Sequence, residues 1–174
     1  MSNLKLEIGN WKLEIPANWR AGFTLPELLI VMAILSILFG FMTPNLLHFR
    51  QRSVLNTTVD TLVTDLKSQQ NKAMVGDTEG SGTISDYGVY FETNRYILFR
   101  GSSYDPLAPS NFSINLDPSL TFSSINLPSS RVVFSKGSGE TGLVSGSDTI
   151  TLTDSTNSDQ KIIKINIYGA ITVQ

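Results

Sequence analysis

The spacing of hydrophobic positions changes twice along this chain. From residue 22 to residue 44 almost every position is apolar, with one carboxylate, Glu27, near the start. The next apolar residues recur at intervals of three and four, which places them on one stripe of a helix: they are Leu55, Val59, Leu62 and Leu66. From residue 87 onward, short runs of β-branched and aromatic residues predict strands.

The first two patterns predict one long helix from Thr24 to Val75, apolar all round in its first half and amphipathic in its second half. Pro44 removes one backbone hydrogen bond, and we expect it to kink the helix without ending it, because the periodic residues resume a few positions later. Gly76 is a stop signal. The Gly/Ser/Thr-rich residues 76–86 then predict a loop.

The strand region begins with a predicted hairpin, in which residues 87–92 and 95–100 flank Thr93-Asn94. Gly169 lies where a tight turn between the last two strands would require it. Ile162, Ile163, Ile165 and Ile167 predict one strongly apolar strand face. The remaining strand candidates are residues 112–116, 120–127, 131–135, 149–153, 161–168 and 170–173. The predicted fold class is α+β, with the amphipathic half of the helix packed on an antiparallel sheet.

Residues 1–21 contain a short echo, Lys5-Leu6-Glu7-Ile8 and Lys12-Leu13-Glu14-Ile15. The alternation of charged and apolar residues allows a short hairpin, but Pro16 interrupts anything longer. A leader without a stable fold is the favoured interpretation.

The apolar run admits three interpretations: a core helix, a secretion signal or a membrane anchor. From Phe23 to Thr43 it has about twenty-one residues, enough to span a bilayer if Glu27 is tolerated. A cleaved secretory signal is disfavoured because Phe41-Met42-Thr43 offers no small-x-small cleavage pattern. A helix that is apolar all round would need more covering elements than the chain offers. The membrane anchor is therefore preferred, with lipid as a partner.

Composition narrows the possible chemistry. Thirteen Lys and Arg stand against fifteen Asp and Glu, a net charge of −2, which argues against nucleic acid as the main partner. There is no cysteine, and His48 is the one histidine, so thiolate chemistry and most nucleophile–base catalysis are excluded. No catalytic residue, cofactor or metal ligand set stands out. Residues 154–159 carry oxygen ligands that could bind calcium, but a plain polar turn is favoured because the glycine and glutamate of an EF-hand loop are missing.

The start of the apolar run resembles the N-terminus of type IV pilins and type II secretion pseudopilins. The matching residues are Gly22-Phe23-Thr24-Leu25-Pro26-Glu27-Leu28, followed by the apolar helix and Pro44. The resemblance implies that a prepilin peptidase cuts between Gly22 and Phe23 and methylates the new N-terminus at Phe23. Glu27 then becomes the fifth residue of the mature chain, and Pro44 becomes its twenty-second, where the family often kinks.

Two roles for Glu27 remain open. Thr24-Leu25-Pro26-Glu27 matches a capping box, which would make the glutamate part of an ordinary helix start. The resemblance implies a second role, in which Glu27 is neutralised by the α-amino group of Phe23 on a neighbouring subunit when a filament assembles. The two roles are compatible.

The strand region has a second resemblance, to the H-type (GspH/FimT-like) minor pseudopilins. The residues that carry it are 65–74, 88–91, 132–134 with Gly137 or Gly139, 150–152 and 165–171. The leader departs from that group, being longer and less basic, so the chain could start at another methionine or come from a lineage with extended leaders.

Together these resemblances imply a structural minor subunit, not an enzyme. The expected organisation is a leader (residues 1–22), a transmembrane segment (23–43), an amphipathic helix (44–75) and a β-rich head (76–174). Prepilin peptidase, other pilin subunits and the inner-membrane assembly machinery are the expected partners. The N-terminus would be cytoplasmic and the head extracytoplasmic. The alternatives are a minor pilin that binds extracellular DNA or a surface, and an unrelated membrane-tethered enzyme or binding protein.

Overall fold

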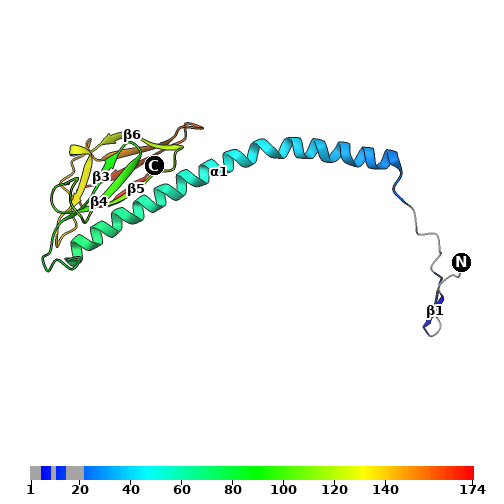
Figure 1. Cartoon of the computed structure of the whole chain (residues 1–174), viewed down its shortest axis with the longest axis horizontal. Helices are drawn as coiled ribbons and strands as arrows, with labels where there is room; N and C mark the ends of the chain where they lie inside the picture. Colours follow the sequence, from blue (N-terminus) through cyan, green and yellow to red (C-terminus); the bar gives the residue numbers. More distant parts are fainter. Residues whose placement is uncertain (1–4, 9–10, 15–21) are drawn as a thin grey trace. The chain divides into compact units, whose positions relative to one another are not determined.

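The computed structural model describes the backbone of residues 5–8, 11–14 and 22–174 and the side chains of residues 22–40 and 54–174 (Figure 1). The chain divides into two compact units, Met1–Asn45 and Leu46–Gln174.

In the first unit, β1 (Lys5–Ile8) and β2 (Trp11–Glu14) pair as an antiparallel hairpin. Lys5 is opposite Glu14 and Ile8 is opposite Trp11, so the two charged-apolar echoes face each other. The sequence allowed a short hairpin here, and the structure contains it; that the leader has no stable fold stays a prediction. An isolated two-stranded hairpin is only marginally stable in water.

Helix α1 (Leu25–Val75) matches the predicted helix within one residue at its start. It continues through Pro44, as predicted, and the kink itself stays a prediction. The helix ends at Gly76, which has a φ of +68°, and the Asp77 N–H donates to the Lys72 carbonyl at 2.9 Å. A glycine in the left-handed region followed by this bond is how many helices close their last turn.

The amphipathic half of α1 carries the predicted stripe. Leu55 and Val59 are each 3% exposed, and Leu62 and Leu66 are fully buried. Ala73 continues the stripe toward the end of the helix and is also fully buried. This face of α1 therefore enters the hydrophobic core of the second unit.

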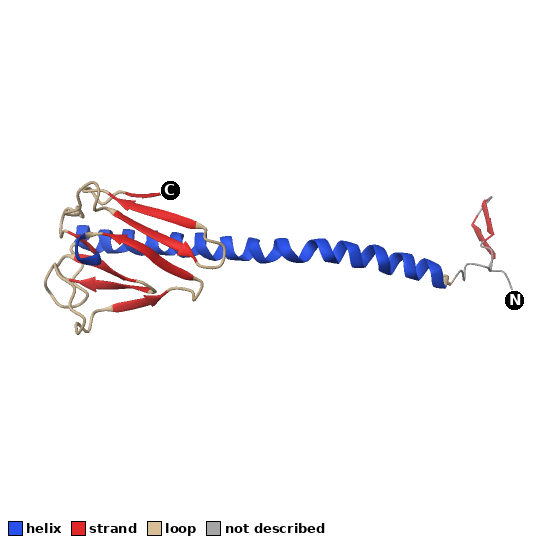
Figure 2. Ribbon diagram, turned by 90° about the horizontal axis from the view of Figure 1, so that it is seen from above, coloured by secondary structure: helices blue, strands red, loops and turns tan. Residues whose placement is uncertain are grey.

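The head contains two four-stranded antiparallel sheets beside this half of α1 (Figures 1 and 2). The first has the order β5-β4-β3-β7, and the second has the order β10-β9-β8-β6. Their strands are β3 (Tyr87–Glu92), β4 (Arg95–Arg100), β5 (Phe112–Asn115), β6 (Leu120–Asn126), β7 (Arg131–Phe134), β8 (Thr149–Asp154), β9 (Gln160–Ile165) and β10 (Ile171–Val173).

Every predicted strand is present, and the β3–β4 hairpin turns at Thr93-Asn94 as expected. The division into two sheets was not predicted. The chain passes from β6 in one sheet to β7 in the other through the short 3₁₀ turn Pro128–Ser130. Ser129 and Ser130 have positive φ angles there, which redirects the backbone between the sheets.

Inward side chains of both sheets meet the helix stripe in one core. Three aromatic rings form its centre: the Phe91 and Phe122 rings pack edge to face at a centroid distance of 5.4 Å, and Tyr96 lies 6.5 Å from Phe122. Phe91 and Tyr96 belong to one sheet and Phe122 to the other, so this cluster joins the sheets as well as filling the core.

The predicted apolar face of residues 161–168 is only partly correct. Ile163 and Ile165 are fully buried, but Ile162 is 37% exposed because neighbouring strand residues point to opposite faces. Strand β9 ends at Ile165, so Ile167 lies in the turn before β10 and is 49% exposed. Gly169 has a φ of +75° in this turn, as its predicted role requires.

Candidate functional site

The residues of the predicted processing site lie immediately before α1. Gly22, Phe23 and Thr24 precede the helix, and the Leu28 N–H donates to the Thr24 carbonyl at 3.1 Å, which begins the helical ladder. A Cβ atom added at Gly22 would meet nothing within 4 Å. The described structure therefore gives no packing reason for a glycine at this position.

Glu27 lies in the first turn of α1 and is exposed. Among the described residues, the reciprocal side-chain hydrogen bonds of a capping box between Thr24 and Glu27 are absent. The carboxylate lies at the positive end of the helix dipole, which favours a negative charge there. The Glu27 carboxylate is therefore not engaged in a capping hydrogen bond with Thr24.

The apolar side chains of residues 23–39 are presented outward, and every described side chain from 22 to 40 is exposed. Phe23 and Leu25 are 74% and 75% exposed. Ser36, a polar residue within the run, donates its hydroxyl to the Met32 carbonyl at 2.7 Å, so its O–H is satisfied inside the helix. Large exposed apolar surfaces mark contacts with a membrane or with other proteins.

None of the helices in the described ranges combines the length and the apolar character that crossing a bilayer requires.

Pro44 belongs to the backbone of α1, but its side chain lies outside the residues whose side chains are described. The structure therefore brings Gly22, Phe23 and Glu27 together at one helix start and leaves the role of Pro44 as a prediction.

Comparison with known families gives one match, on the same stretch. Residues 20–43 match the family model of the prokaryotic N-terminal methylation motif. The chain thus carries a type IV pilin-like leader. The motif supports a pilin-like or pseudopilin precursor, suggests a structural protein, and implies processing by prepilin peptidase and assembly with other pilin subunits. No curated protein and no solved structure gives a significant match.

The acidic turn between β8 and β9 has a local structure of its own. Asp154 is fully buried, and its Oδ1 accepts the Thr156 N–H at 2.8 Å. The Asn157 amide donates to Asp159 Oδ2 at 3.0 Å. These bonds define a polar turn, and the described residues hold no cluster of three or more potential metal-binding side chains.

Two polar residues of the helix were not singled out from the sequence. Tyr96 of β4 donates its hydroxyl to Asp65 Oδ2 at 2.6 Å, which links β4 to α1. Gln69 is 3% exposed, seven residues after Leu62 on the buried stripe. The burial of Gln69 could have been predicted from the sequence, because this polar residue lies at a position of the apolar stripe. No sequence signal pairs Tyr96 with Asp65, because they are 31 positions apart.

Proposed function

We propose that this protein is the precursor of a minor subunit, an H-type pseudopilin or minor pilin, of a type IV pilus or type II secretion filament. The observation that carries the proposal is the methylation-motif match at residues 20–43, in which Gly22-Phe23 precedes a helix with Glu27 in its first turn.

Maturation takes place at the Gly22–Phe23 peptide bond. Prepilin peptidase hydrolyses this bond, residues 1–22 leave as the leader, and a methyl group is added to the new α-amino nitrogen of Phe23. Gly22 is open on all sides in the precursor, so the requirement for glycine comes from the peptidase and not from packing. A small residue before the cleaved bond lets the backbone approach a protein surface closely.

Residues 23–43 anchor the subunit in the cytoplasmic membrane before assembly. The run is long enough to span the hydrocarbon layer, and its exposed side chains suit lipid. The N-terminus is cytoplasmic and the head extracytoplasmic, an orientation taken from the family resemblance, and the inner-membrane machinery draws the subunit into the filament. Pro44 kinks the helix between the anchor and the amphipathic half.

Glu27 gives the assembly step its selectivity. A lone charged side chain inside a bilayer is costly, about 2.5–3.5 kcal/mol at the centre and less toward the edge, so the Glu27 carboxylate favours any position that supplies a partner. The α-amino group of Phe23 on a neighbouring subunit is such a partner, and the absence of a capping bond leaves the carboxylate available for it.

Two of the residues that carry the H-type resemblance, Gly88 and Gly169, lie where the structure has no room for a side chain, which supports the proposal. A Cβ atom on Gly88 of β3 would lie 2.5 Å from Phe99 Cζ and 2.6 Å from the Val132 carbonyl oxygen. A Cβ atom on Gly169 would lie 2.2 Å from Gln70 Nε2. Both glycines therefore allow neighbouring side chains and backbone of the head to pack directly against their own backbone.

The cleavage step is tested by Gly22→Ala and Gly22→Leu in a host with prepilin peptidase. We expect both variants to keep the mass of the precursor, whereas the wild-type protein loses residues 1–22. Gly40→Ala is the matched control, because a Cβ atom there also meets nothing within 4 Å. Loss of the leader from Gly22→Leu at the wild-type rate would contradict the assigned site.

The assembly step is tested by Glu27→Gln, which keeps the shape of the side chain and removes its charge. We expect normal leader removal and a loss of the subunit from sheared filaments, measured by immunoblotting. Ser36→Ala, which alters a polar residue of the same apolar run, should assemble normally. Wild-type incorporation of Glu27→Gln would refute the role of the carboxylate.

The alternative of DNA binding is not favoured by three of the described cations. Lys72, Arg95 and Lys164 each pair with a carboxylate, at 2.7, 2.7 and 3.4 Å. Cations that are already paired contribute little to phosphate binding.

A further inference from the structure

A pocket of about 280 Å³ opens beside the C-terminal end of α1. Its walls come from the helix, from the loop that follows it, and from β4 and β5 at the edge of the first sheet. The residues that line it are Gln69, Lys72, Glu79, Tyr87, Leu98, Phe99, Arg100, Ser110 and Phe112. None of the roles proposed above for the N-terminal motif involves this pocket.

The first feature of the pocket is an amide side chain that lines it and has no hydrogen-bond partner among the described residues. Gln69 is 3% exposed, yet its side-chain amide forms no hydrogen bond with any described residue. The amide atoms of Gln69 are not among the fully enclosed polar atoms that lack a partner, so they keep accessible surface. The amide can therefore form hydrogen bonds with a ligand that enters the pocket.

The second feature is a guanidinium group without a carboxylate partner. Among the described residues, Arg100 donates through Nη2 to the carbonyl and hydroxyl oxygens of Thr83, and its Nε is buried with no acceptor. Thr83 is neutral, so the positive charge of Arg100 is not compensated there.

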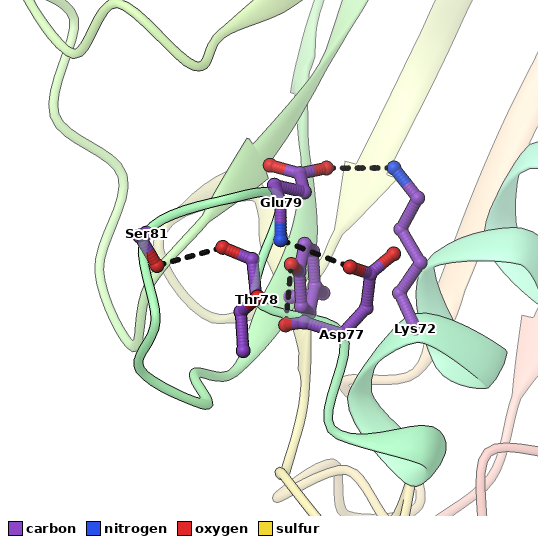
Figure 3. Close-up of polar contacts among 6 residues, drawn as sticks. Lys72, Asp77, Thr78, Glu79 and Ser81 are labelled. Carbon is purple, nitrogen blue, oxygen red and sulfur yellow. Dashed lines mark hydrogen bonds and ion pairs between the residues drawn. The ribbon is translucent and has the colours of Figure 1, made fainter.

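The other two charges of the pocket neutralise each other. Lys72 Nζ lies 2.7 Å from Glu79 Oε1, and Figure 3 shows this pair above the loop that follows α1. The hydrogen bond that Lys72 donates to the Glu79 carboxylate raises the pKa of Lys72, so the lysine stays protonated and bound to its partner. The Glu79 N–H also bonds to Asp77 Oδ1 at 2.9 Å, and Tyr87 donates its hydroxyl to the Asp77 carbonyl at 2.8 Å, which hold this loop in place. Of the charged side chains that line the pocket, Arg100 is therefore left with a positive charge that no carboxylate of the lining neutralises.

The third feature is an apolar wall opposite these polar groups. Leu98 and Phe112 are register partners on β4 and β5, so their side chains share one face of the sheet edge. Phe112 is 65% exposed, an unusual exposure for a phenylalanine on a strand. An apolar group in the pocket would cover this ring.

We propose that this pocket binds a carboxylate carried on a compact apolar group. Arg100 and Gln69 bind the carboxylate oxygens, and Leu98 and Phe112 pack against the apolar part. Arg100 suits this ligand because its guanidinium group is always positively charged and has N–H donors besides the Nε–H and those that bond to Thr83. The same chemistry occurs in a free branched-chain acid and in the C-terminal residue of a polypeptide.

The proposal is tested by NMR on the full chain, labelled with ¹⁵N and held in detergent micelles. The probes are isovalerate and N-acetyl-alanyl-leucine, each compared with the amide that replaces its carboxylate. We expect both acids to shift the Gln69 side-chain and Arg100 Nε–H resonances, with dissociation constants on the order of 1 mM, and the amides to bind at least about tenfold more weakly. Tighter binding of the dipeptide would identify a chain terminus as the source, and tighter binding of isovalerate would identify a free acid.

Variants separate the pocket from general effects of charge. Arg100→Met and Gln69→Leu should each lower the affinity for the acids at least about tenfold. Ser110→Phe adds bulk at an exposed position in the pocket lining and should block binding without removing an internal contact. Arg131→Met is the control, since Arg131 bonds to Ser103 outside the pocket and its loss should leave binding unchanged.

Circular dichroism of each variant confirms that it is folded. The proposal is overturned if neither acid shifts the Gln69 and Arg100 resonances, if acids and amides bind equally, or if folded Ser110→Phe binds as the wild type does.

Discussion

At the scale of single residues, the bond between Tyr96 and Asp65 is the shortest direct side-chain link described between α1 and a strand. The tyrosine hydroxyl donates to Asp65 Oδ2 at 2.6 Å, and Tyr96 is 1% exposed. Burial, with a contribution from the Asp65 carboxylate, raises the pKa of Tyr96 well above its usual range. The tyrosine therefore remains a neutral donor at any physiological pH.

Tyr96→Phe removes this donor and leaves the ring in the core. We expect the free energy of unfolding to fall by about 1.5–3 kcal/mol, the range for a hydrogen bond to a charged group, in urea titrations. Tyr90→Phe is the matched control, because the Tyr90 ring stacks on Tyr104 at 4.2 Å and the substitution keeps that stack. Equal stability of Tyr96→Phe and the wild type would show that the bond contributes nothing.

The raised pKa of Tyr96 also predicts a pH dependence. Below pH of about 10, the tyrosine is neutral in both the folded and the unfolded chain, and its contribution to stability is complete. Above that pH the unfolded chain releases the proton while the folded chain retains it, so the wild type loses stability by up to about 1.4 kcal/mol per pH unit. Tyr96→Phe should lack this component between pH 10 and 11. Parallel curves for the two proteins would contradict the prediction.

At the scale of elements, the side chain of Gln70 joins α1 to the turn between β9 and β10. Gln70 Nε2 donates to the Gly139 carbonyl at 3.0 Å and to the Tyr168 carbonyl at 3.3 Å. The Gly137 N–H also donates to the Ala73 carbonyl at 2.9 Å, near the end of the helix. These contacts attach the last turns of the helix to two loops of the head.

Gly169→Ala should break this attachment. The new Cβ atom would lie 2.2 Å from Gln70 Nε2 and 2.7 Å from the Gly139 oxygen, and φ is +75° at this position. We expect a loss of about 2–4 kcal/mol in the free energy of unfolding, from overpacking and backbone strain together. Gly80→Ala is the matched control: its φ is +79°, but its Cβ would meet nothing within 4 Å. The difference between the two variants measures the steric part, and no difference would refute it.

At the scale of the whole molecule, the described hydrophobic core lies in the second unit. Its residues all fall within Leu46–Gln174, whereas the described side chains of residues 22–40 are exposed. One continuous segment of the chain therefore contains the whole described core.

We expect a fragment of residues 46–174 to fold on its own in water without detergent. It should unfold in one cooperative transition by circular dichroism, because it contains the complete described core. A shorter fragment of residues 60–174 is the control: it lacks Leu55 and Val59, and should be less stable by at least about 3 kcal/mol. A longer fragment without a cooperative transition would show that the head needs the N-terminal segment.

Local patterns were sufficient for most of the elements. The three-and-four spacing of Leu55, Val59, Leu62 and Leu66 determined the buried face of α1, because a helix repeats every 3.6 residues whatever it packs against. The Gly22-Phe23 pair and Glu27 predicted the N-terminal methylation motif, which the family comparison matches at residues 20–43, because such a motif is a short linear segment; cleavage after Gly22 and the role of Glu27 stay predictions. The turn at Gly169 followed from the backbone freedom of one residue.

The tertiary structure decided what depends on residues distant in the sequence. Alternation along a strand gives its faces but not its partners, so the division into two sheets at Pro128–Ser130 and the exposure of Ile162 and Ile167 required the fold. The same holds for the Tyr96–Asp65 bond and for the pocket around Gln69 and Arg100. Periodicity is a property of consecutive residues, whereas these features arise where segments dozens of positions apart are brought within hydrogen-bonding distance.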